Sequence, residues 1–165
     1  MNEHPILGQL VLGYAPMLDR QRRVTATRLT VFPQRPDQSP DGAALLRALV
    51  EAWPEGGDAL LLNVASEGLL HQLLTTPLPV HIGLEVPAFM AADASHAPLL
   101  AALQARGNAL YLKGRLATPL PRDVLGCFRQ ALVELDDERR DGAEAAGGSA
   151  RGLAFVQTGI RCASD

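Results

Sequence analysis

Cysteine, positive charge and long apolar runs are all scarce in this chain. Its two cysteines, Cys127 and Cys162, are far apart and outside C-x-x-C spacing, so neither a disulfide framework nor a zinc site is indicated. The net charge of −3 provides no basic field for nucleic acid or an anionic membrane surface. No apolar run approaches the ~20 residues that span a bilayer, and the N-terminus lacks a basic signal region. We therefore expect a reduced, cytoplasmic setting.

Motifs for common cofactors are also missing. No G-x-G-x-x-G follows an apolar run, no Walker A sequence occurs, and the four histidines show no metal-ligand spacing. The composition, 47% hydrophobic and 20% charged, is that of an ordinary globular protein. A chain of 165 residues is long enough for one domain with a core. We predict a single domain over residues 1–165 with no cofactor.

The pattern of apolar residues predicts an α/β fold. Gly8–Met17 and Arg23–Phe32 read as two strands joined by a short polar turn, which predicts an antiparallel hairpin. Helices and apolar strands then alternate, as is typical of a parallel sheet, open or closed. We expect helices from Gly42 to Trp53, after Ser66 and from Pro98 to Ala105, and strands at Ala59–Val64, Val80–Val86, Ala109–Leu112 and Gly152–Ile160.

Two later segments are less regular. Leu125–Leu135 suits either a helix or a helical turn that runs into a strand. Residues 136–150 are charged and then rich in Gly and Ala, so we expect a flexible internal loop there.

Six segments, in order, resemble the landmarks of EAL domains, the barrels that hydrolyse cyclic di-GMP. Residues 14–24, Tyr-Ala-Pro-Met-Leu-Asp-Arg-Gln-Arg-Arg-Val, resemble the family's opening strand and basic turn, and are closest to the variant EAL halves of EAL–HDOD proteins. The other segments are 62–65 (family Asn-Val/Leu-Ser), 84–88 (Glu-Leu-Thr-Glu), 107–115 (glycine, apolar strand, Asp-Asp-Phe), 131–134 (Lys-Ile-Asp) and 156–161 (Ala-Glu-Gly-Val-Glu). The resemblance implies a TIM-like (β/α) barrel with an initial antiparallel hairpin, incomplete at the C-terminus, covering about the first two-thirds of the domain.

The same resemblance implies a degenerate site. Family members hold divalent cations through carboxylates and an asparagine. Here the Glu of Glu-Ala-Leu falls on Arg28 and the Asp-Asp pair begins at Lys113, while Asn63 and Glu85 are retained and Glu134 replaces the last Asp. Further family residues are lost at Ala88, Leu132 and Thr158. Because hard cations need oxygen ligands, we expect neither a catalytic nor a metal site.

Two interpretations of these residues stay open. Asn63 and Glu85 are either leftover polar residues at strand ends, or Glu85 is neutralised by a basic side chain from Arg28 or Lys113. The resemblance implies an inactive regulatory module that acts through protein contacts, with a protein partner or self-association at an open sheet edge. The alternatives are a metal-dependent cyclic di-GMP phosphodiesterase and a sensor that binds cyclic di-GMP without cleaving it.

Overall fold

The computed structural model describes residues 4–35, 37, 39–53, 56–116, 118–134 and 153–158, and it shows a mixed α/β protein made of two compact units. The first unit contains the chain up to Leu84 together with Arg106–Asn108, and the second contains Glu85–Ala105 and the chain from Ala109. The boundary falls within one strand. That the two units form the single predicted domain stays a prediction.

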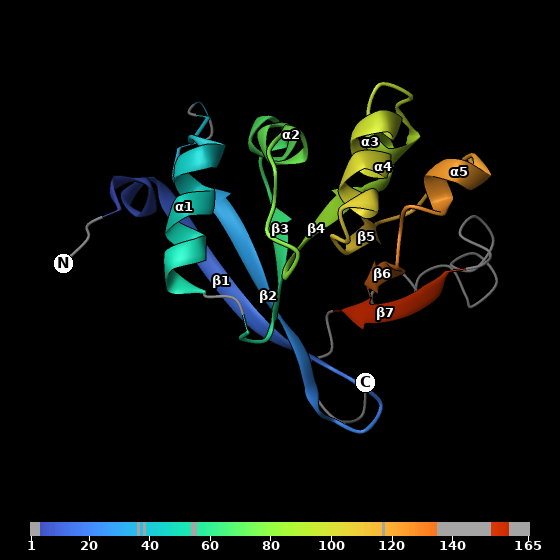
Figure 1. The fold of residues 1–165 in the computed structure, drawn as a ribbon, viewed down its shortest axis with the longest axis horizontal. Coiled ribbons are helices and arrows are strands. Elements are labelled where there is room, and N and C mark those ends of the chain that lie inside the picture. Colours follow the sequence, from blue (N-terminus) through green and yellow to red (C-terminus); the bar gives the residue numbers. More distant parts are fainter. Residues whose placement is uncertain are drawn as a thin grey trace. The chain divides into compact units, whose positions relative to one another are not determined.

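The first unit is a hairpin followed by parallel strands and two helices (Figure 1). Strands β1 and β2 are antiparallel, whereas β2, β3 and β4 are parallel to one another. Its elements are a 3-10 helix η1 (Pro5–Gln9), β1 (Leu10–Leu18), β2 (Val24–Pro33), α1 (Gly42–Ala52), β3 (Ala59–Val64), α2 (Glu67–Thr75) and the start of β4 (Ile82–Pro87). The predicted hairpin and the predicted alternation are confirmed here.

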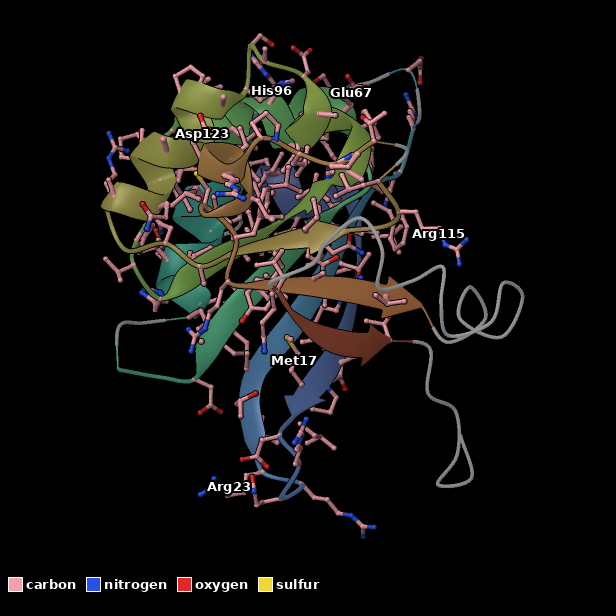
Figure 2. The ribbon with its side chains drawn as sticks, turned by 90° about the vertical axis from the view of Figure 1, so that its right-hand side faces the viewer. Met17, Arg23, Glu67, His96, Arg115 and Asp123 are labelled. Carbon is pink, nitrogen blue, oxygen red and sulfur yellow. The ribbon has the colours of Figure 1, made fainter. Side chains whose placement is uncertain are left out.

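The turn of the hairpin is organised by one carboxylate. The Asp19 carboxylate accepts hydrogen bonds from the backbone N–H groups of Gln21 (2.8 Å) and Arg23 (2.9 Å) and pairs with Nε of Arg23 at 2.9 Å. These bonds hold the pKa of Asp19 below its usual value, with the backbone N–H of Arg23 as the largest cause. Arg22 has a φ of 63°, a left-handed conformation that glycine or asparagine adopts more easily. Figure 2 shows Arg23 at the tip of the hairpin and Met17 further along β1.

The hydrogen-bond pattern of β1 explains its proline. The backbone N–H of Gln34 donates to the carbonyl oxygen of Gln9 (2.9 Å), so these two residues form a bonded pair at the start of the ladder. Bonded and non-bonded pairs alternate along antiparallel strands, so Pro16 falls at a non-bonded position. Its missing N–H would have pointed away from β2, and no ladder hydrogen bond is lost.

The core of the first unit lies around β3. Leu60–Val64 are all buried, as expected for a strand covered on both faces. Ser66 accepts a hydrogen bond from the backbone N–H of Leu69 (3.3 Å) and caps α2, as predicted. Helix α1 meets α2 closely at Gly42, where an added Cβ would lie 3.0 Å from Cβ of Gln72. The Gln72 side chain also accepts a hydrogen bond from the backbone N–H of Gly42 at 2.8 Å.

A buried asparagine fixes the segment that leads into β4. The Asn108 side chain is 3% exposed, and its amide nitrogen donates to the carbonyl oxygens of Pro79 (2.8 Å) and Ile82 (3.0 Å). It follows Gly107, whose φ of +94° ends the preceding helix in the left-handed conformation that was expected of a glycine there. One amide thus closes the loop before the strand that carries Glu85.

The second unit alternates short helices and parallel strands. In it β5 pairs with β6 and β6 with β7, both in parallel. Its elements are the end of β4, α3 (Ala88–Ala92), α4 (Ala97–Ala105), β5 (Leu110–Lys113), α5 (Arg122–Leu125), β6 (Gln130–Glu134) and β7 (Ala154–Thr158). The described part of the ambiguous segment, residues 125–134, is therefore the end of a helical turn followed by a strand, which is one of its two predicted forms.

One expected boundary was wrong, one helix was not expected, and one expected loop lies outside the described residues. The first strand begins at Leu10 and not at Gly8, because Pro5, with its φ already fixed near the helical value, starts a 3-10 helix that runs to Gln9. Helix α3 was not predicted at all. The expected loop at 136–150 lies outside the described residues.

Candidate functional site

The first unit brings Arg28 and Asn63 to one face of the sheet. Thr30 is the register partner of Asn63, and Arg28 is the register partner of Leu61, two residues before Asn63. Alternate residues of a strand share a face, and register partners of parallel strands share it too. From a strand spacing of ~4.8 Å and a rise of ~3.3 Å per residue, the backbones of Arg28 and Asn63 lie one diagonal step apart, roughly 8 Å.

Asn63 is held in place by its neighbour. Its side chain is 7% exposed, and its amide nitrogen donates to the hydroxyl oxygen of Thr30 at 3.2 Å. This bond fixes the plane of the amide. Because the amide NH2 group is a hydrogen-bond donor, the carbonyl oxygen is the only atom of the Asn63 side chain with the chemistry of a cation ligand. Arg28 is half-buried on the same face. A guanidinium therefore occupies the position at which the family resemblance requires a carboxylate.

The second unit holds the other predicted residues at the ends of its strands. Glu85 lies in β4 and is 1% exposed. A buried carboxylate needs compensation from charges or hydrogen-bond donors around it. Pro87 and Ala88 follow, and Ala88 is already the buried first residue of α3. The second glutamate position of the family motif is thus a small apolar residue in a packed helix.

Lys113, Leu132 and Glu134 occupy one face of the strand pair β5 and β6. Lys113 is the register partner of Leu132, and Glu134 follows two residues later, opposite Thr158 of β7. Lys113 is half-buried, and Leu132 is 3% exposed. The Glu134 side chain lies outside the described residues. At this end of the sheet, Lys113 places an ammonium group where the resemblance expects a carboxylate. Leu132 places an apolar side chain where the resemblance expects a lysine.

The five candidate residues are divided between the units. Arg28 and Asn63 belong to the first unit, and Glu85, Lys113 and Glu134 belong to the second. The expected pairing of Glu85 with a basic side chain stays a prediction. Among the described residues, no group of three or more His, Cys, Asp or Glu side chains could hold a metal ion. The divalent cations used by the family do not fit positions that carry Arg28 and Lys113.

Sequence reasoning missed two residues that define the local geometry. Thr30 orients Asn63 across the two parallel strands, and Asn108 fixes the loop before β4. Neither could be found from local pattern, because each contact joins segments about thirty residues apart. The only available signal is that each is a polar residue in or next to an apolar strand.

Cys127 has the properties of an unreactive thiol. Its Sγ lies 3.4 Å from the carbonyl oxygen of Asp123, to which it donates. Burial, and secondly the negative charge of Asp123, raise the pKa of the Cys127 thiol above its ordinary value. A thiol that stays protonated at neutral pH is a poor nucleophile, which agrees with its interpretation as a small apolar residue.

No protein-family model matches the chain, and no curated protein matches it. Within the described residues, no helix is both long enough and apolar enough to cross a membrane.

Proposed function

We propose that this chain is a degenerate EAL-like module that regulates signalling through protein contacts and does not hydrolyse cyclic di-GMP. The finer architecture, a TIM-like (β/α) barrel with an antiparallel first strand, is part of the proposal. Its support is the motif order of the sequence together with an antiparallel hairpin that leads into parallel strands separated by helices.

The observation that carries the proposal is the position of Arg28. It lies on the same face as Asn63 and one diagonal step from it, so a cation bound to the Asn63 carbonyl oxygen would meet a guanidinium. Mg²⁺ and Mn²⁺ need several oxygen ligands in tight geometry, and metal-assisted hydrolysis needs the cation to activate water and stabilise the phosphate. If no cation binds, another group must activate the water as a general base. The residues that carry the resemblance supply none at this end of β2 and β3.

The test is a hydrolysis assay on the full chain. Purified protein is incubated with cyclic di-GMP and Mg²⁺ or Mn²⁺, and the linear product pGpG is measured against a no-enzyme control. We expect no product above the control. Product accumulation would show an active phosphodiesterase and contradict the proposal.

Calorimetric titration with cyclic di-GMP, with and without Mg²⁺, separates the remaining alternative. We expect no binding heat under either condition. Binding without turnover would identify a sensor in place of a module that acts through protein contacts. A double variant, Arg28→Glu with Lys113→Asp, is the matched comparison, because it restores two family carboxylates; tighter Mn²⁺ binding by this variant would support the assignment of both positions.

A further inference from the structure

Strand β1 is an apolar edge strand. In the first unit it pairs with β2, and no other strand described there pairs with it. Its nine residues, Leu-Val-Leu-Gly-Tyr-Ala-Pro-Met-Leu, carry no charge, yet Val11 is 53% exposed, Leu12 41% and Tyr14 84%. Natural edge strands usually carry charged residues that prevent pairing with another chain. This one has none between Leu10 and Leu18.

The direction of the backbone groups shows which residues could pair. Gln9 and Gln34 form a bonded pair, so by alternation the bonded positions of β1 are its odd-numbered residues up to Met17. The N–H and C=O groups of Leu10, Leu12 and Tyr14 therefore point away from β2. Pro16 has no N–H to offer on that side and ends the stretch. The Leu10 N–H already donates to the carbonyl oxygen of Leu7, so the outer edge presents the Leu10 carbonyl and two full donor–acceptor positions, Leu12 and Tyr14.

We propose that this edge binds a second copy of the chain, with β1 antiparallel to β1 of the partner and Leu12 facing Leu12 across a twofold axis. In this register Leu12 exchanges both of its backbone hydrogen bonds with Leu12 of the other copy, and the Tyr14 N–H donates to the Leu10 carbonyl oxygen of the other copy. Pro16 falls outside the paired stretch. Val11 then faces Gly13, which leaves room for the valine side chain on the opposite face.

Charge favours this occupant and this direction. A twofold contact brings two copies of the same stretch together, so charges of one sign within the stretch would repel one another, and none is present. Beyond the stretch lie Arg20, Arg22 and Arg23 of the turn. Figure 1 shows the hairpin extending past β3 to that turn. Arg20 lies eight residues beyond Leu12, so antiparallel pairing separates the two turns by about 50 Å, far beyond the ~8 Å screening length. Parallel pairing would place the arginines side by side.

The proposal does not depend on the EAL resemblance, and its test uses the full chain. Sedimentation velocity over a range of micromolar concentrations should show a dimer for the wild type. Leu12→Lys and Leu12→Glu should each weaken self-association about tenfold or more, because each places like charges on directly facing residues. An equimolar mixture of the two variants should regain the dimer, because the facing charges are then opposite.

The matched control is Leu18→Lys. Leu18 is 56% exposed on the same strand but lies outside the paired stretch, so this variant should remain dimeric. Leu12→Pro should be monomeric and keep the wild-type circular dichroism spectrum, because the N–H that it removes points away from β2. A monomeric wild type would overturn the proposal, and so would a dimer that survives Leu12→Lys. Loss of the dimer in Leu12→Lys with no recovery in the mixture would overturn the register.

Discussion

The amide of Asn108 provides the sharpest test of the packing in the first unit. Its nitrogen donates to two carbonyl oxygens, those of Pro79 and Ile82, from a side chain that is 3% exposed. Asn108→Ala removes both donors, but the Pro79 carbonyl oxygen keeps the hydrogen bond from the backbone N–H of Ile82 (3.0 Å). An unsatisfied buried group costs roughly 1–3 kcal/mol, so we expect this variant to lower the free energy of unfolding by about 1–3 kcal/mol.

Asn108→Asp should cost more at neutral pH. A carboxylate cannot donate to the carbonyls, so the folded state must keep the acid protonated, and its pKa is raised. Holding a group with an ordinary pKa of ~3.9 neutral at about pH 7 costs about 4 kcal/mol, at ~1.4 kcal/mol per unit. The protonated acid still has one O–H donor for the Ile82 carbonyl, while the Pro79 carbonyl keeps the hydrogen bond from the Ile82 N–H, so the protonation cost dominates.

The two variants should therefore change order with pH. A group whose pKa is raised on folding contributes its full stability below the unfolded pKa and loses it as the pH rises through the folded pKa. Near pH ~4 the protonation cost almost disappears, and Asn108→Asp, with its one remaining hydrogen bond, should be more stable than Asn108→Ala. At about pH 7 it should be less stable.

Urea denaturation of both variants at the two pH values measures this inversion. Gln104→Asp, at an exposed helix position, is the control, and its stability should stay within about 0.5 kcal/mol of wild type. Our reasoning about the buried amide is refuted if both Asn108 variants keep the wild-type midpoint. An unchanged order at the two pH values would refute the argument about the buried acid.

Three further outcomes follow from local chemistry. Arg22→Asn should raise the free energy of unfolding by up to about 1 kcal/mol, measured by urea denaturation, because asparagine tolerates the left-handed conformation better. Asp19→Asn should lower the free energy of unfolding at neutral pH. Because the pKa of Asp19 is depressed, the wild type loses this advantage as the pH falls below ~3.9. The urea midpoints of the wild type and the variant should therefore converge in acid. In a Cys162→Ser background, alkylation of Cys127 should reach half its maximal rate above pH 9.0, because the thiol pKa is raised from that value.

Local signals account for the elements that were predicted. The turn after Met17, the cap at Ser66 and the stop at Gly107 each depend on a few neighbouring residues, and all three are present in the structure. Helix α3 was missed because it has five residues, fewer than two turns, and so has no apolar period to detect. It begins directly after Pro87, where the strand ladder ends.

The candidate site was harder to predict because it depends on register. Sequence pattern indicates that Arg23–Phe32 and Ala59–Val64 are strands, but a shift of one residue would move Arg28 to the opposite face from Asn63. The contact between Thr30 and Asn63 fixes that register, and no pattern within either strand announces it. The assignment of site residues came from motif order, and the shared face of Arg28 and Asn63 is a finding of the structure.

The charge of Arg28 opposes metal binding at Asn63. At about 8 Å, the separation of the two backbones, and an effective dielectric constant of about 20, the repulsion between the guanidinium and a divalent cation is about 4 kcal/mol. This is an upper bound of about a thousandfold in affinity, because solvent and the groups that Arg28 contacts screen it. Arg28→Met removes the charge and supplies no ligand, whereas Arg28→Glu reverses the charge and supplies one. Calorimetry with Mn²⁺ should therefore rank affinity as Arg28→Glu above Arg28→Met above wild type. Equal affinity for Arg28→Met and wild type would show that the missing ligands, and not the repulsion, exclude the cation.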